Sequence, residues 1–260
     1  RIFINRRVNM ATRIINRNAS LWASPKAKLS VPFAGPWEGF FSFGIDAATS
    51  VRNLIEDKPA LSVIGSPLYG GNYIELTGAQ VAYLATSIKN TEDMTIVASV
   101  MPMNDASSAV VSNYQSQRAD GTGLCIGTQL GFDINTPADG NVQATFNHGV
   151  LVNGISTGAR ANTPDAPINT WSLISGRVKN SARTRTVNNL TTGTTGVNSP
   201  ALNPADLGDF LRIGSAYNSQ FGGMVRVCEV AILSGYLADA DFALLVQLMR
   251  ASAAKKGIVV

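Results

Sequence analysis

Short runs of alternating apolar and polar residues predict β-strands along much of the chain. In the run YIELTG at residues 73–78, Ile74 and Leu76 fall on one face and the polar Glu75 and Thr77 on the other. Successive side chains of a strand point to opposite faces, so this pattern predicts a strand with one buried face.

Two longer runs predict interior strands. Residues 94–103, MTIVASVMPM, are almost continuously apolar, which predicts a central strand covered on both faces. Residues 224–233, MVRVCEVAIL, contain two charged residues, Arg226 and Glu229, at a spacing of three. Strict alternation would put them on opposite faces, so either the strand is bulged between them or most of both faces is covered.

The pattern changes from a strand period to a helix period near the C-terminus. Phe242, Leu245 and Met249 recur at a helical spacing, and Asp239 precedes them as a candidate N-cap. We therefore expect a short C-terminal helix, packed on the rim of a sheet structure.

The predicted strands recur about every 8 to 15 residues with turn residues between them, which is typical of a β-sandwich, jelly roll or barrel. Thr, Ser, Asn and Gly are abundant and charged residues are scarce, at 15% of the chain. This composition favours strands and turns over helix bundles. We expect one sandwich domain over residues 37–260.

The first 36 residues differ from the rest in charge. They hold basic residues and no acidic one, since the first acid is Glu38. This segment is interpreted as an extended docking arm for another subunit, with these contact residues: Arg6, Arg7, Arg13, Arg17, Trp22, Lys26 and Lys28. The alternatives are a solvated leader and an arm that packs on its own sandwich.

The arm does not predict nucleic-acid binding, because no basic patch interleaved with aromatic residues follows it. No run approaches the roughly 18 apolar residues that a membrane-spanning helix needs, so membrane insertion is not expected.

Four segments in order resemble concanavalin A-like and laminin G-like jelly rolls. These are GGNYIELTG, TEDMTIVASVMPM, NTWSLISGRV and the closing segment that begins FLRIGSAYNSQFGG. The resemblance covers about residues 40–250 and implies a jelly-roll β-sandwich. Residues 183–193 depart from the family pattern after the Trp-bearing strand, which argues against a ligand site at that edge.

Some enzymes of this fold cut β-glucans with two carboxylates at alternate positions of one strand. None of the five glutamates here has an acid two residues away, and the one acid-x-acid pair, Asp239 and Asp241, falls at the predicted helix start. Acids favour that position because of the helix dipole. The sequence therefore favours a protein that is not an enzyme.

The other reactive residues predict no metal or cofactor. The sole histidine, His148, lies in the turn-like FNHGV and is expected to be exposed. Cys125 and Cys228 are expected to be buried free thiols, although a disulfide between them stays open. Four residues have oxygens suited to calcium, Asp133, Asn135, Asp139 and Asn141, but Asn, Asp and Gly also suit an ordinary polar hairpin loop.

Small jelly rolls with a short N-terminal arm resemble surface proteins of tailed bacteriophages. That resemblance implies a structural or adhesive virion protein, a tail fibre, appendage or capsid decoration, assembled in the host cytoplasm. Expected partners are other virion proteins, copies of itself in a homo-oligomer, and a host-surface glycan. The alternatives are a cellular carbohydrate-binding module and, less favoured, a glycoside hydrolase.

Overall fold

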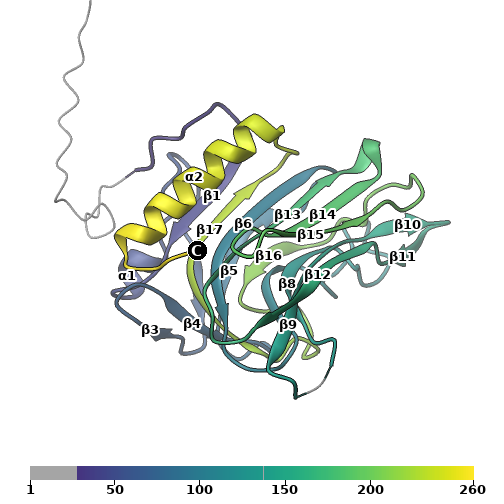
Figure 1. The fold of residues 1–260 in the computed structure, drawn as a ribbon. Coiled ribbons are helices and arrows are strands. Elements are labelled where there is room, and N and C mark those ends of the chain that lie inside the picture. Colours follow the sequence, from purple (N-terminus) through teal and green to yellow (C-terminus); the bar gives the residue numbers. More distant parts are fainter. Residues whose placement is uncertain (1–27, 137) are drawn as a thin grey trace, which may run out of the picture.

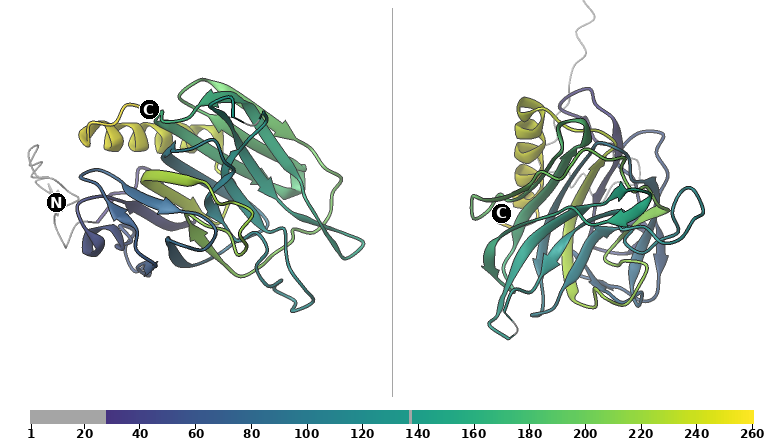
Figure 2. Two further views of the ribbon diagram at one scale, coloured as in Figure 1. Left: turned by 90° about the horizontal axis from the view of Figure 1, so that it is seen from below. Right: turned by 90° about the vertical axis from the view of Figure 1, so that its right-hand side faces the viewer.

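The computed structural model describes residues 28–136 and 138–260. Two antiparallel sheets are stacked face to face, and a C-terminal helix lies on one side of the stack (Figures 1 and 2). This arrangement is a jelly-roll β-sandwich with a C-terminal helix, as predicted.

The first sheet has eight strands. Its order is β15 (Thr194–Asn198), β14 (Thr184–Asn189), β13 (Ser172–Lys179), β6 (Met94–Pro102), β17 (Met224–Leu233), β4 (Ile74–Thr77) and β3 (Leu68–Tyr69), and β1 (Trp37–Ser42) also pairs with β17. The predicted central strand is confirmed, because every residue of β6 is buried.

The second sheet has seven strands. Its order is β12 (Arg160–Pro167), β9 (Asn141–His148), β8 (Thr128–Asp133), β7 (Ser108–Ser112), β16 (Phe210–Ile213), β5 (Tyr83–Lys89) and β2 (Ser62–Ile64). A separate hairpin of β10 (Val150–Val152) and β11 (Ile155–Thr157) projects at one end of the sandwich (Figure 1).

The main core lies between the two sheets. Alternate residues of β6 point into it, namely Ile96, Ala98 and Val100, and they pack in one cluster with Ala144 and Phe146 of β9. The opposite residues of each strand therefore point to the outer face of its sheet.

Strand β17 is bulged, which is one of the two alternatives that the sequence left open. Its pairing with β6 shifts register between Val227 and Glu229. The extra residue lets Arg226 form an ion pair with Glu75, Nε to Oε2 at 2.8 Å, while the Glu229 side chain is fully buried. The bulge explains how two charged residues three positions apart fit one interior strand.

The C-terminal helix α2 (Asp239–Lys255) is longer than the short helix expected from the sequence, and it does not lie on the rim as predicted. It covers the outer face of the eight-stranded sheet rather than its rim, because Leu245 and Met249 pack against Val97, Leu173 and Leu233. The other helices are α1 (Ala47–Ser50) and the 3-10 turn η1 (Asn180–Ala182). None of the helices in the described ranges is both long enough and apolar enough to cross a membrane.

The N-cap of α2 is Ala238, which makes no side-chain capping bond, so the prediction of Asp239 at that position was wrong. Asp239 and Asp241 lie in the first turn, where the helix dipole favours acids. Oδ1 of Asp239 also accepts a hydrogen bond from Nη1 of Arg177 at 2.8 Å, which forms an ion pair.

Residues 28–36 lie against the sandwich. The backbone N–H of Leu29 donates to the carbonyl of Leu54 at 2.8 Å, and the ring of Phe33 stacks on Trp37 with centroids 5.1 Å apart. Lys28 is exposed. The other predicted arm residues, Arg6, Arg7, Arg13, Arg17, Trp22 and Lys26, lie outside the described residues, so the docking arm over residues 1–36 stays a prediction.

One edge of the sandwich is closed by contact between the two sheets. The side chain of Asn198 in β15 donates from Nδ2 to the carbonyl of Arg160 in β12 at 2.7 Å. At the far ends of the two sheets, β3 has two residues and β2 has three.

Candidate functional site

The outer face of the seven-stranded sheet is not covered by α2 (Figure 2). In β9, Val142, Ala144 and Phe146 point into the core, so the alternate residues Thr145 and Asn147 point outward. The chemistry of this face is therefore set by the polar half of each strand.

Cross-strand pairing aligns five polar residues in one row across this face. Arg160 pairs with Asn147, Asn147 with Gln129, Gln129 with Ser112, and Ser112 with Arg212. Neighbouring strands lie about 4.8 Å apart, so the row spans roughly 19 Å perpendicular to the strands. We call these five residues the polar row.

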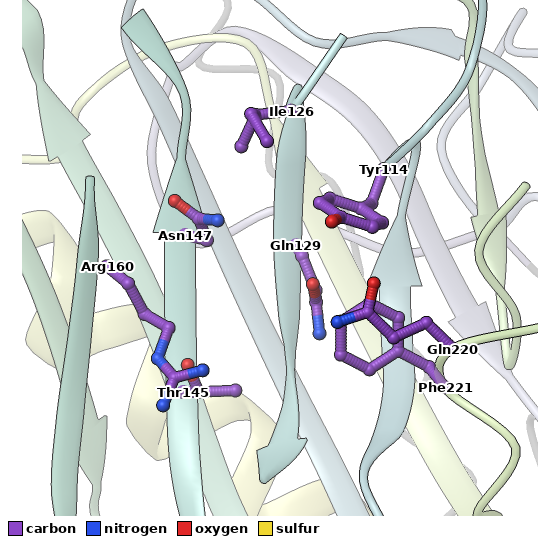
Figure 3. A pocket seen from close by; sticks show the side chains of 8 residues that line it. All are labelled: Tyr114, Ile126, Gln129, Thr145, Asn147, Arg160, Gln220 and Phe221. Carbon is purple, nitrogen blue, oxygen red and sulfur yellow. The ribbon is translucent and has the colours of Figure 1, made fainter. Parts of the chain in front are cut away.

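A hollow of about 130 Å³ opens over one half of the polar row. It is lined by Tyr114, Ile126, Gln129, Thr145, Asn147, Arg160, Gln220 and Phe221 (Figure 3). Polar side chains from three neighbouring strands meet an aromatic wall in which Tyr114 and Phe221 contact edge to face, with centroids 5.4 Å apart. Carboxamides beside aromatic rings form a lining that can both hydrogen-bond a ligand and stack against it.

Two polar side chains in the lining lack hydrogen-bond partners in the described part of the chain. The Thr145 side chain is only 2% exposed, yet its Oγ1 has no partner. Gln129 is 3% exposed, and its carboxamide also makes no hydrogen bond to described residues. Buried polar groups are normally satisfied, so an unpaired hydroxyl beside a hollow marks a place where water or a ligand can supply the missing bond.

Arg160 at one end of the polar row is neutralised. Its Nη1 contacts Oδ2 of Asp133, and the other oxygen of Asp133 accepts from the hydroxyl of Ser107. This end of the row therefore carries no net charge.

The candidate calcium residues do not converge. Asp133 is engaged by Arg160 and Ser107, whereas Asp139 accepts from the backbone N–H of Asn141 at 2.8 Å within the loop. Within residues 28–136 and 138–260, no group of three His, Cys, Asp or Glu side chains is placed to hold a metal. The polar hairpin interpretation is the one that the geometry supports.

His148 is not an exposed turn residue, so that prediction was wrong. It ends strand β9, and alternation turns its ring into the core, where it is fully buried. Nδ1 hydrogen-bonds Oγ1 of Thr128 at 2.8 Å, and Nε2 has no described partner. Burial, with a smaller contribution from the charge of Arg185, lowers the pKa of His148 to about 3. The ring is therefore neutral at ordinary pH and lies away from the hollow.

Both cysteines are buried free thiols, as predicted. Burial raises the pKa of Cys228 to about 12, so its thiol stays protonated and unreactive.

Glu229 is a buried carboxyl on the opposite side of the molecule, beneath α2. Its Oε1 accepts from the hydroxyl of Ser252 and lies 3.8 Å from Nζ of Lys256, while Oε2 has no described partner. Burial raises the pKa of Glu229 to about 7, and Lys256 opposes that shift. Glu229 is not in the lining of the hollow described above, and its contacts with Ser252 and Lys256 tie the sheet to the C-terminal helix.

Sequence reasoning missed the residues of the site, namely Gln129, Thr145, Asn147, Gln220 and Arg212. The alternation in NVQATFNH over β9 was the available signal, because it separates an apolar face from a polar one. The polar row itself depends on the register between five strands, and the sequence pattern of a single strand does not specify that register.

The fold and the hollow define a β-sandwich with one covered and one open outer face. No model of a known protein family matches the chain, and no curated protein matches it in sequence.

Solved structures do match the fold. The receptor binding domain of botulinum neurotoxin C/D mosaic serotype is similar with a TM-score of 0.52 at 10% identity, over 83% of this chain and 52% of that one. The binding domain of Paraclostridial Mosquitocidal Protein 1 is similar with a TM-score of 0.55 at 14% identity, over 82% and 52%. The ligand binding domain of botulinum neurotoxin serotype D, in complex with N-acetylneuraminic acid, gives 0.52 at 10%, over 83% and 52%. At these identities the likeness shows the fold, and this chain spans about half the length of the chains it matches.

Proposed function

We propose that this protein is a non-enzymatic glycan-binding β-sandwich whose ligand lies on the outer face of the seven-stranded sheet. The observation that carries the proposal is the hollow over the polar row, where the buried hydroxyl of Thr145 has no described partner and the carboxamide of Gln129 lines the wall.

The composition of the lining fits a sugar. Asn147 and Gln220 supply donors and acceptors for hydroxyl groups, and Tyr114 and Phe221 supply apolar surface for the C–H face of a ring. A similar fold occurs in a structure described as a complex with N-acetylneuraminic acid, which is consistent with this ligand class.

The lining also supports a binding role rather than hydrolysis. Glycoside hydrolases need two carboxyl groups across the scissile bond. The side chains around the hollow include no Asp, Glu or His, and the nearest carboxylate described above, Asp133, is neutralised by Arg160.

The test is a glycan array followed by titration calorimetry on the strongest ligand. Gln129→Ala should weaken binding by about fivefold, the loss of a neutral hydrogen bond or two. Because Gln129 is 3% exposed, its truncation also removes packing, so a melting curve must show that the variant is folded before its affinity is compared.

Gln247→Ala, on the exposed side of α2, is the matched control and should bind like the wild type. An array on which no glycan binds, or equal binding by Gln129→Ala, would contradict the proposal.

The second part of the proposal is that the module is carried on a virion of a tailed bacteriophage, in the tail fibre, an appendage or the capsid decoration. Residues 1–36 include seven basic residues and no acid, which suits attachment to an acidic surface of another virion protein or a second copy. In this proposal Trp22 and the basic residues form the anchor, and the open face of the sandwich meets the host glycan.

Removing residues 1–27 tests the anchor. Leu29 and Phe33 contact the sandwich, so a cut before residue 28 leaves those contacts in place. The truncated protein should keep its melting temperature but fail to join purified particles, as measured by mass spectrometry. Full-length protein missing from the particles would favour a cellular carbohydrate-binding module instead.

A further inference from the structure

The far end of the polar row holds an arginine in an unusual setting. The guanidinium of Arg212 lies between two aromatic rings, with Cζ 3.4 Å from the centroid of Tyr217 and 4.6 Å from that of Tyr83. Its hydrogen bonds to described residues are both made by Nη1, to Oε1 of Gln80 at 3.1 Å and to the carbonyl of Ala216 at 3.0 Å. Contact with both rings positions the planar guanidinium, and none of its N–H groups donates to a carboxylate of the described residues.

The two ends of the row differ in charge. Arg160 is paired with Asp133, whereas Arg212 forms no ion pair with any carboxylate of the described residues. Lys89 adds a second positive charge near Arg212: it is paired across the strands with Phe210, and its Nζ lies 5.1 Å from that ring. Asp209 lies near Tyr217 but does not form an ion pair with Arg212, so the row has one ion-paired end and one end with an excess of positive charge.

The hollow and the arginine lie on the same outer face, on either side of Tyr114 and the buried Ser112. The backbone N–H of Tyr217 donates to the carbonyl of Tyr114, a lining residue of the hollow, at 3.0 Å. Gln129 in the hollow is separated from Arg212 by Ser112 alone in the row, which is roughly 10 Å. A short oligosaccharide is long enough to reach both.

We propose that Arg212, clamped between Tyr83 and Tyr217, is an anion-binding subsite, so that the glycan crosses the strands with a neutral sugar in the hollow and an acidic group at Arg212. This inference rests on the proposed glycan-binding function and names its substrate class. A guanidinium binds a carboxylate or a phosphate through two parallel hydrogen bonds, so the acidic group is that of a uronic or sialic acid or of a sugar phosphate.

The test uses three probes: oligogalacturonate, the same oligomer with its carboxyl groups reduced, and poly(glycerol phosphate). The wild-type protein should bind at least one anionic probe about 10-fold to 100-fold more tightly than the reduced oligomer, the range expected for a charged hydrogen bond. The preferred probe tells carboxylate from phosphate. The affinity should also fall with added salt.

Arg212→Gln should remove the preference for the anionic probe, and Arg212→Lys, which keeps the charge but not the planar fork, should retain part of it. Arg250→Gln on α2 makes the same charge change on the covered side and should leave the preference unchanged. Melting curves check that each variant is folded, and the wild-type comparison of probes does not depend on any variant.

Equal affinity of the wild type for the anionic and reduced probes, or a preference that survives in folded Arg212→Gln, would overturn the subsite. Neutral glycans on the array would still bind in that case, and the proposed function would stand. Absence of binding to any glycan would instead overturn the proposed function and the subsite together.

Discussion

The two outer faces of the sandwich follow the same alternation but hold different side chains. On the eight-stranded sheet the outward residues include Val97, Leu173 and Leu233, and α2 covers them. On the seven-stranded sheet they include Thr145 and Asn147, and a hollow lies above them. An apolar face must be covered by the protein itself, whereas a polar face can stay open to a ligand.

Each face also holds a buried polar group, and the two differ in what surrounds them. The carboxyl group of Glu229 beneath α2 accepts a hydrogen bond from the hydroxyl of Ser252 and faces the ammonium group of Lys256 at the end of the helix. Thr145 beneath the hollow has no partner for its hydroxyl among the described residues. The fold therefore supplies partners for one oxygen of Glu229, whereas the hydroxyl of Thr145 needs a partner from outside the described residues.

The largest expected effect comes from breaking the covered face. Leu245→Ala should lower the free energy of unfolding by about 2–5 kcal/mol, because Leu245 is fully buried against the sheet and its loss leaves a cavity. Chemical denaturation measures this. Leu244→Ala, one position along and 40% exposed, is the control and should change stability by less than about 1 kcal/mol. Similar losses in both variants would mean that α2 does not pack as described.

The next largest effect is a pH dependence of stability that comes from Glu229 beneath the helix. Because the pKa of Glu229 rises from 4.5 to about 7 on folding, the folded protein binds more protons in that range, and stability falls as pH rises through it. The pKa of His148 falls from 6.5 to about 3 on folding, so the contribution of His148 to the free energy of unfolding increases as pH rises over that range. The two slopes oppose each other between pH 4.5 and 6.5, each at most about 1.4 kcal/mol per pH unit.

Glu229→Gln should remove the fall in stability with pH that Glu229 causes and leave the rise that His148 causes. We expect the stability of the variant to rise more steeply with pH between 4.5 and 6.5 than that of the wild type. Denaturant unfolding at several pH values measures the difference between the two profiles. Parallel profiles would show that Glu229 titrates alike in the folded and unfolded chains.

The smallest effect on stability is expected on the open face. Thr145→Val replaces an unpartnered hydroxyl with a methyl group, so stability should stay equal or increase by up to about 1 kcal/mol while glycan binding weakens. Thr128→Val is the matched control: its hydroxyl hydrogen-bonds His148, and stability should fall by about 1–3 kcal/mol. A loss of stability in Thr145→Val would mean that the hydroxyl has a partner within the protein.

The sequence predicted the elements whose own pattern is strong. The apolar run of β6 and the alternation of Ile74 and Leu76 in β4 are local signals, and both strands form as expected. The spacing of Phe242, Leu245 and Met249 likewise indicated α2, and all three side chains are buried.

Features that depend on distant partners were not predicted. His148 looked exposed because NHG resembles a turn, but Thr128 and the neighbouring strands enclose it. The position of α2 over a sheet face depends on Leu173, far from it in the chain. The polar row combines residues 112, 129, 147, 160 and 212, which only the strand register brings into line.

The closed edge between β12 and β15 bears on how many copies can be crowded together. A free strand edge offers unpaired N–H and C=O groups to a neighbouring molecule and so invites aggregation. Here the bond from Asn198 to Arg160 joins the two sheets at one side. At the far side the end strands β3 and β2 have two and three residues, and the free edge of β1 is bonded by Asn53 and Leu54. At these places the sheets therefore offer few backbone groups for pairing with the sheet of another molecule.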